Sequence, residues 1–294
     1  MKLIRDIYAE RRVKKQPTVS FEFFPPKTDE GERIFLEKTL PGMARLKPDF
    51  CSVTYGAGGS TRDKTLMITD RIQREHALIA VHHLTCMMST GGQLGEILDQ
   101  ATRLDIRNIL ALRGDPPLGS ACDFTAGCGF ARELVTFIHS RGGFCVGAAG
   151  FPEGHVACKA GKYVDWGYLK EKIDAGVDFI LTQLFFENAA FYEFYEHLTQ
   201  ELGVTIPLVP GIMPIFSAAQ IQHISQLCAV HWPAPLLARV HALADNEAGL
   251  MDFGIEYATR QCEELLKYGV PGLHLYTLNK LRPTREIVKN LKLA

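Results

Sequence analysis

The sequence has no excess of either charge, because 32 lysine and arginine residues nearly balance 33 aspartate and glutamate residues. The net charge of −1 gives no overall field that would attract nucleic acid or an anionic membrane. No stretch approaches the roughly 20 apolar residues needed to cross a bilayer. Residues 1–16 are basic but lack the apolar core of a secretory signal. These absences predict a cytoplasmic protein without nucleic-acid binding or membrane insertion.

The eight cysteines form no Cys-x2-Cys pair and no cluster with histidine at the spacing of a zinc site. We therefore expect no metal site and no iron–sulfur centre within this chain. Free cysteine behaves mainly as a small apolar residue. Most of these thiols are thus predicted to be buried, in a reducing compartment.

Short runs of apolar, β-branched or aromatic residues recur along the chain and predict eight strands. The runs begin at Val19, Phe50, Ile79, Asn108, Phe144, Phe179, Pro207 and Gly272. The first seven begin 28 to 36 residues apart, and the eighth begins 65 residues after the seventh. One β-α-β step takes about 30 residues, so the last gap holds an additional helix. Helical periodicity is seen in residues 33–46, 92–104, 132–141, 190–202, 217–227 and 247–268, with a proline-rich connection at 231–235.

Eight parallel strands with crossover helices predict an α/β fold, a (β/α)8 TIM barrel. A doubly wound open sheet is the alternative. The chain has 294 residues, 47% of them apolar, which suits one large core. No linker divides it, so we expect residues 1–294 to form a single domain.

Polar residues gather at the carboxyl ends of the predicted strands, where barrel enzymes carry their chemistry. In chain order they are Glu22, Thr54, Tyr55, His83, Thr85, Arg113, Asp115, Glu153, His155, Thr182, Gln183, Tyr276 and Asn279. Glu22 is the sharpest signal, because Phe21, Phe23 and Phe24 flank it. Loss of hydration among these rings would raise the pKa of the carboxyl and suit it to act as a general acid. A buried Glu22 paired with a barrel lysine or arginine is the alternative.

The remaining motifs are ambiguous when each is taken alone. Residues 55–61 are glycine-rich and could admit a phosphate or a planar ring, but they lack the GxGxxG and Walker spacings. Residues 113–115, Arg-Gly-Asp, could form an ordinary turn. His82 and His83 should point to opposite faces of their strand, which prevents both from binding one metal ion. Gln183 could bind the edge of a heterocycle or satisfy buried backbone groups.

Taken in order, these segments resemble the catalytic barrel of methylenetetrahydrofolate reductases. The resemblance rests on FEFFPPKT from Phe21, SVTYGAGGSTRD from Ser52, HLTC from His83 and LALRGDPP from Leu110. It continues in FPEGH from Phe151, KIDAGVDFILTQLFF from Lys172, VPGIMPI from Val209 and LYTLN from Leu275. The order of these motifs along nearly the whole chain is highly specific.

The resemblance implies a flavoenzyme of one-carbon metabolism and methionine biosynthesis, with FAD or FMN as cofactor. It would reduce 5,10-methylenetetrahydrofolate to 5-methyltetrahydrofolate, with Glu22 as general acid opening the imidazolidine ring to an iminium ion. Asp115 would stabilise that cation, and the folate would contact Gln183, Tyr276 and Lys280. The implied flavin contacts are Thr54, Tyr55, Ala57, His83, Arg113, Gly114, Asp115, Ala131, Phe151, His155, Asp165 and Lys172.

Some positions depart from the family pattern. Phe151 and Phe130 replace tyrosines, Ala218 replaces an aromatic residue, and Lys280 stands where some relatives have arginine. Lysine keeps the charge of arginine but not its bidentate fork. The resemblance leaves open whether NADH, NADPH or a redox protein partner, such as an iron–sulfur protein, donates the electrons, and whether the chain forms an oligomer.

Two other functions remain as alternatives at this stage. The chain could be a partner-dependent electron-transfer subunit of a larger redox complex, or a flavin-free aldolase-like barrel enzyme. None of the eight runs contains the lysine that Schiff-base chemistry would need. Because sixteen residues follow Leu278 of the last run, we also expect no C-terminal regulatory domain.

Overall fold

Parallel strands form the centre of the molecule. The computed structural model describes residues 1–55, 62–87, 89–114, 129–228 and 230–293. Its strands form one sheet in which all the neighbouring pairs are parallel. Their order is β7 (Leu208–Val209), β6 (Phe179–Thr182), β5 (Cys145–Gly150), β4 (Asn108–Leu112), β3 (Ala80–Thr85), β2 (Phe50–Val53), β1 (Thr18–Phe23), β9 (Gly272–Tyr276) and β8 (Gly211–Ile212).

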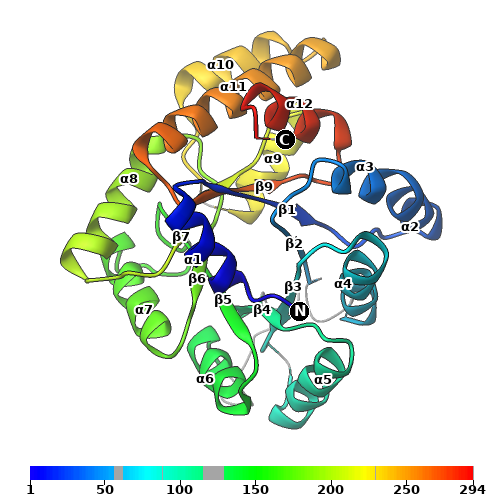
Figure 1. Cartoon of the computed structure of the whole chain (residues 1–294). Coiled ribbons are helices and arrows are strands. Elements are labelled where there is room, and N and C mark those ends of the chain that lie inside the picture. The colour runs from blue at the N-terminus through cyan, green and yellow to red at the C-terminus, as the bar shows by residue number, and fades with distance from the viewer. Residues whose placement is uncertain (56–61, 88, 115–128, 229, 294) are drawn as a thin grey trace.

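One extended segment closes this sheet into a ring. β7 and β8 are separated only by Pro210; β7 pairs with β6, and β8 pairs with β9. Proline has no N–H to donate, but the carbonyl of Pro210 accepts a hydrogen bond from the backbone N–H of His274 at 3.0 Å. The two ends of the sheet are therefore joined, which confirms the predicted (β/α)8 barrel over an open sheet. Figure 1 shows the helices arranged around the strands.

The helices lie where the repeating pattern predicts them, with some additions. They are α1 (Ile4–Lys14), α2 (Asp29–Ile34), η1 (Phe35–Thr39), α3 (Leu40–Ala44), α4 (Arg62–His76), α5 (Gly91–Arg103), α6 (Ala131–Arg141), α7 (Lys162–Asp174), α8 (Asn188–Glu196), η3 (His197–Glu201), α9 (Ala218–Leu227), α10 (Ala234–Ala242), α11 (Glu247–Tyr268) and α12 (Leu281–Asn290). The proline-rich connection is shorter than predicted, because α10 begins at Ala234. Its Pro235 lies in the first turn, where a missing N–H costs no hydrogen bond.

The basic N-terminal segment has a structural role that the sequence did not reveal. Ile4, Ile7 and Tyr8 of α1 are buried against side chains inside the barrel, among them Phe50 and Phe179 at the first positions of β2 and β6. Figure 1 shows α1 crossing the middle of the ring of helices. Helix α1 therefore covers the amino-terminal end of the barrel and leaves its carboxyl end for the site.

Side chains alternate along each strand between the barrel interior and the helices, as expected for β-structure. On β1, Val19, Phe21 and Phe23 belong to the core shared with the helices. Ser20 and Glu22 instead bond to groups on neighbouring strands inside the barrel. This alternation decides which polar residues can meet at the site.

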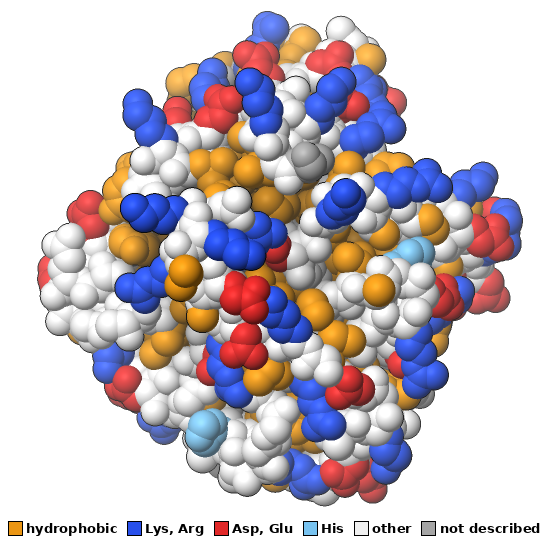
Figure 2. Space-filling view, viewed as in Figure 1, with side chains coloured by type: hydrophobic (Ala, Val, Ile, Leu, Met, Phe, Trp, Pro, Cys, Tyr) orange, Lys and Arg blue, Asp and Glu red, His pale blue; other side chains and the backbone are white. Residues whose placement is uncertain are grey.

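The distribution of charged side chains on the surface agrees with the nearly equal numbers of basic and acidic residues in the sequence. On the face shown in Figure 2, lysine and arginine are interspersed with aspartate and glutamate. Within the described part of the chain, no helix combines the length and the apolar character needed to span a membrane.

Candidate active site

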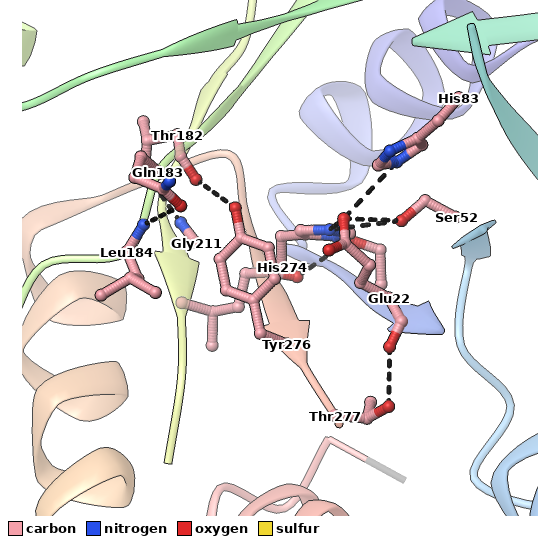
Figure 3. Close-up of polar contacts among 12 residues, drawn as sticks. Glu22, Ser52, His83, Thr182, Gln183, Leu184, Gly211, His274, Tyr276 and Thr277 are labelled. Atoms are coloured by element: carbon pink, nitrogen blue, oxygen red, sulfur yellow. Dashed lines mark hydrogen bonds and ion pairs between the residues drawn. The ribbon is translucent and has the colours of Figure 1, made fainter. Parts of the chain in front are cut away.

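The carboxyl group of Glu22 lies inside the barrel, near the carboxyl end of β1, and meets three side chains from other strands (Figure 3). The Oγ of Ser52 on β2 donates to Oε2 of Glu22 at 3.2 Å. The Nε2 of His274 on β9 lies 3.3 Å from the same oxygen, and the Nε2 of His83 on β3 lies 3.5 Å away. These four strands are neighbours in the ring. The closed barrel therefore gathers one carboxylate, one hydroxyl and two imidazoles.

The rings of Phe21 and Phe23 do not surround the carboxyl of Glu22, which corrects the sequence-based expectation for these two residues. Phe21 and Phe23 point to the opposite face of β1 and pack under the helices. Burial raises the pKa of the Glu22 carboxyl, but the hydrogen bond from His274, the electrostatic influence of the His83 and His274 imidazoles and the bond from Ser52 outweigh it and lower the pKa below its usual value. The predicted raised pKa is therefore wrong, since the polar neighbours favour the carboxylate.

His83 and His82 point to opposite faces of β3, as predicted. His83 is buried beside Glu22, and burial lowers the pKa of its imidazole to about 4. His82 is buried on the helix side, where its ring meets that of Tyr55 edge to face at 6.1 Å. Burial lowers the pKa of His82 to about 3. Both imidazoles are therefore neutral at neutral pH.

His274 is the functional candidate that the sequence analysis missed. Its imidazole is fully buried, with Nδ1 2.8 Å from the Oγ of Ser20 and Nε2 facing Glu22. The ring of Phe50 stacks on it at 6.3 Å with an interplanar angle of 18°. A signal did exist, because His274 precedes Tyr276 by two residues and must share its face of the strand.

Tyr276 lies between Glu22 and Gln183 (Figure 3). Its hydroxyl donates to the carbonyl oxygen of Thr182 at 2.6 Å, and its ring lies 5.4 Å from that of His274. The side-chain amide of Gln183 donates to the Sγ of Cys228 at 3.1 Å and accepts from the backbone N–H of Leu184 at 3.1 Å. Glu22, Tyr276 and Gln183 are thus brought together, with the amide of Gln183 bonded to groups of the chain.

A second group of predicted residues lies beyond β5. The ring of Phe151 meets that of His155 edge to face at 4.6 Å, and the carboxylate of Asp165 accepts from the backbone N–H of His155 at 3.1 Å. The Nζ of Lys172 donates to the carbonyl of Ala149 at 2.8 Å. Burial lowers the pKa of Lys172 to about 8, although Asp165 acts in the opposite direction. This arrangement links the ring of Phe151 through His155 to the carboxylate of Asp165, whose charge acts on the partly buried amine of Lys172.

The backbone connects the two groups, because the N–H of Gln183 donates to the carbonyl of Gly150 at 2.7 Å. Gly150 directly precedes Phe151. Gln183 and Phe151 are therefore held together at the carboxyl ends of β6 and β5, the barrel end that α1 leaves open.

The other predicted residues are distributed as follows. Thr54 and Tyr55 follow β2, Arg113 and Gly114 follow β4, and Ala131 begins α6. The Nε of Arg113 donates to the carbonyl of Gly114 at 3.3 Å, and Gly114 has a φ of 85° that favours glycine. Lys280 is exposed just before α12. Ala57 and Asp115 lie outside the described residues.

The described cysteines fit a structural role: Cys51, Cys86, Cys145 and Cys262 are buried, while Cys158 and Cys228 are partly exposed. In the same part of the chain, no group of three or more histidine, cysteine, aspartate or glutamate side chains could hold a metal ion.

Comparison with known proteins agrees with the order of the motifs. The family model described as methylenetetrahydrofolate reductase matches residues 6–292. The chain is 34% identical over 279 residues to the 5,10-methylenetetrahydrofolate reductase of Escherichia coli, covering 95% of this chain and 92% of that protein. It is 38% identical over 290 residues to methylenetetrahydrofolate reductase (NADH) 1 of Arabidopsis thaliana, covering 95% of this chain and 49% of that protein. The chain thus spans about half the length of the plant relatives it matches.

A solved structure shares the fold at low sequence identity. It is an uncharacterised protein from Clostridium thermocellum that binds two copies of 5-methyl-5,6,7,8-tetrahydrofolic acid. The TM-score is 0.66 at 12% identity, with 97% of this chain and 98% of that chain covered. At this identity the likeness supports the barrel architecture alone.

Proposed function

Because the chain belongs to the methylenetetrahydrofolate reductase family, we propose that it reduces 5,10-methylenetetrahydrofolate to 5-methyltetrahydrofolate. We further propose that residues 1–294 act as one catalytic domain with a bound flavin, FAD or FMN. The observation that carries the proposal is the buried carboxyl of Glu22, held by Ser52 and His274 near the carboxyl end of the barrel. That is the end where barrel enzymes bind their substrates.

The residues beyond β5 suit a flavin. Phe151 offers an aromatic face, and the largely desolvated amine of Lys172 would be stabilised by an anionic group such as a phosphate. Asp165 and His155 can form hydrogen bonds with hydroxyl groups. The other proposed contacts are Thr54, Tyr55, Ala57, His83, Arg113, Gly114, Asp115 and Ala131. When bound, the reduced flavin supplies the hydride.

The folate would occupy the space near Tyr276 and Gln183. An amide side chain both donates and accepts hydrogen bonds, which matches the edge of a pterin. To bind it, Gln183 would exchange its bond to Cys228 for bonds to the ligand. Lys280, exposed before α12, would attract the negatively charged tail of the folate.

Glu22 would act as the general acid. It gives a proton to one nitrogen of the imidazolidine ring, the bond from that nitrogen to the one-carbon unit breaks, and the electron pair stays on that nitrogen. The other nitrogen and the carbon form a cationic iminium that accepts hydride. The carboxylate of Asp115 would stabilise this cation. Because the neighbours of Glu22 lower its pKa, the carboxyl must receive a proton before it can donate one.

Electrons would reach the flavin in a separate half-reaction at the same site. The donor leaves before the folate binds, which predicts ping-pong kinetics. We propose a nicotinamide dinucleotide or a redox protein partner as donor. Assays with NADH, with NADPH and with a cell extract distinguish these reductants.

The function is tested by the visible spectrum of the purified protein and by one mixing experiment. A flavin spectrum is expected, and after anaerobic reduction the flavin should reoxidise rapidly when methylenetetrahydrofolate is added. A colourless protein that neither FAD nor FMN reconstitutes would contradict the proposal and favour a flavin-free barrel enzyme. A flavin that the folate does not reoxidise would favour an electron-transfer subunit.

The role of Glu22 is tested by Glu22→Gln, which keeps the shape of the side chain but removes its acid. Reduction of the flavin should continue at the wild-type rate, while reoxidation by methylenetetrahydrofolate should slow by about 10²- to 10⁴-fold. Stopped-flow absorbance measures both half-reactions. Glu96→Gln, an exposed change on α5, is the control and should alter neither rate. Folate-dependent reoxidation at the wild-type rate in Glu22→Gln would remove Glu22 from its role.

A further inference from the structure

The buried side chains behind Glu22 form a line of hydrogen-bonding groups that leads away from the substrate end. Oε2 of Glu22 faces Nε2 of His274 at 3.3 Å, and Nδ1 of His274 faces the Oγ of Ser20 at 2.8 Å. The Oγ of Ser20 also lies 3.2 Å from the carbonyl oxygen of Leu273. Each member of the line thus has a partner on both sides.

The hydroxyl of Ser20 allows His274 to exist in two protonation states without an unpaired buried group. When Nδ1 carries no proton, the Ser20 hydroxyl can donate to it. When Nδ1 carries a proton, it can donate to the Oγ of Ser20, whose hydroxyl turns to the carbonyl of Leu273. An unpaired buried polar group destabilises a protein, so this arrangement lowers the cost of changing the protonation state.

The two histidines beside Glu22 are not equivalent. In the part of the chain that the structure describes, the Nε2 of His83 has no hydrogen-bond partner and lies 3.5 Å from Glu22. Both nitrogens of His274 have partners. The geometry therefore equips His274, with a partner at each ring nitrogen in either protonation state, to pass a proton to the Glu22 carboxylate, while burial keeps His83 neutral with a pKa of about 4.

Resting on the function proposed above, we infer that His274, supported by Ser20, holds the proton that Glu22 gives to the folate. Before transfer, His274 is an imidazolium ion and Glu22 a carboxylate. The N–H bond at Nε2 breaks, an O–H bond forms at Oε2, and both side chains become neutral. Glu22 then passes this proton to the ring nitrogen of the folate. After the product leaves, a proton from water enters through Glu22 and restores the pair. His274 is a positioning residue, because it acts through Glu22.

The groups that face His274 support this assignment. Glu22 on β1 is the charge partner, and β2 contributes Ser52 and the stacked ring of Phe50. Tyr276, the nearest titratable group on β9 itself, stays neutral because burial raises its pKa well above 10. On the other side, β8 contributes Gly211, which has no side chain and pairs with His274. Among the described neighbours, Glu22 is thus the negative charge next to His274.

The first test observes the protonation state directly, in the protein without folate. ¹⁵N NMR of histidine-labelled protein at pH 7 should show one buried imidazolium whose signal disappears in His274→Gln. In Glu22→Gln the same imidazole should become neutral, because its counter-charge is gone. A neutral His274 at pH 7 in the wild-type protein would overturn the inference.

The second test uses kinetics that a merely structural role would not alter. In His274→Gln, reduction of the flavin should be unchanged, and folate-dependent reoxidation should slow by about 10- to 100-fold at pH 8. The loss should shrink toward pH 6, where Glu22 can take its proton directly from water. Ser20→Ala should show a smaller loss with the same pH dependence, which keeps the test informative if His274→Gln folds poorly.

The outcomes separate this inference from the proposed function. A wild-type protein that does not reduce methylenetetrahydrofolate contradicts the function itself. If the wild-type protein reduces methylenetetrahydrofolate, the function stands and the variants test His274. Variants that slow equally at every pH, or that do not slow at all, would contradict the role of His274 alone.

Discussion

At the scale of the residue, Gly211 shows how closely the barrel packs where it closes. A Cβ atom there would lie 2.2 Å from the carbonyl oxygen of Thr182 and 2.6 Å from the ring of Tyr276. The same carbonyl accepts the hydroxyl of Tyr276, and the N–H of Gly211 donates to Thr182 Oγ1 at 2.9 Å. Gly211 thus allows β6, β8 and β9 to approach one another beside the proposed folate site.

We predict that Gly211→Ala destabilises the protein, because the added methyl group must displace backbone as well as the tyrosine ring. The free energy of unfolding should fall by about 1–3 kcal/mol, measured by urea unfolding followed by circular dichroism. Gly167→Ala in α7 is the control, since its Cβ has open space. There the helix propensity of alanine should raise stability by about 0.5–1 kcal/mol. Equal stability of the two variants would contradict the close approach at Gly211.

The sequence predicted the position of Glu22 but not its environment. A carboxylate within an apolar run can be recognised in the sequence. Its partner His274 cannot, because it lies 252 residues further along the chain. The flanking rings of Phe21 and Phe23 suggested a raised pKa, yet strand alternation directs them to the other face. The direction of the pKa shift follows from neighbours that only the closed barrel brings together.

At the scale of the element, the strands were predictable because each is a short apolar run within a repeating unit. The eight predicted runs correspond to β1 to β6, the divided β7 and β8, and β9. Pro210 explains the division, because it cannot donate a hydrogen bond to the ladder. Helices α1 and α10 were not predicted. Helix α10 contains a proline, a residue that usually indicates a connection. Helix α1 is basic, and its apolar residues are buried only because they pack against the end of the barrel.

The position of α1 gives a prediction for that helix. Ile7 is 5% exposed against the barrel end, while Val13 in the same helix is 84% exposed. Ile7→Ala should lower the free energy of unfolding by about 2–4 kcal/mol, because it removes buried methyl groups and leaves a cavity. Val13→Ala should change it by less than about 0.5 kcal/mol. Urea unfolding of both variants tests this difference, and similar losses would show that α1 does not seal the barrel.

At the scale of the whole molecule, closure of the ring turns scattered polar residues into one site. β1, β2, β3 and β9 each contribute one group to the Glu22 cluster, and these strands come from both ends of the chain. Closure buries His83 inside the barrel, and His82 is buried on the opposite, helix-facing side of β3. Because both imidazoles are buried, the free energy of unfolding should depend on pH in acid.

We predict a marked loss of stability between pH 6.5 and about pH 4. Burial lowers the pKa of His82 to about 3 and that of His83 to about 4. Below pH 6.5 the unfolded chain therefore binds protons at these two positions while the folded chain does not, so stability falls as the pH falls. Each histidine contributes about 1.4 kcal/mol per pH unit within this range. The lowered pKa of Glu22 acts in the same direction near the acid end of the range.

Removing one imidazole separates this effect from the titration of carboxylates elsewhere. Between pH 6.5 and 4.5, His82→Gln should lose roughly 2–3 kcal/mol less stability than the wild-type protein. Urea unfolding at several pH values measures how the free energy of unfolding changes with pH. A loss of stability that the substitution causes equally at every pH does not affect this comparison. The control is His139→Gln, an exposed change on α6. If His82→Gln and the wild-type protein lose the same stability, the imidazole of His82 is not held neutral, because a buried neutral histidine must steepen the acid response.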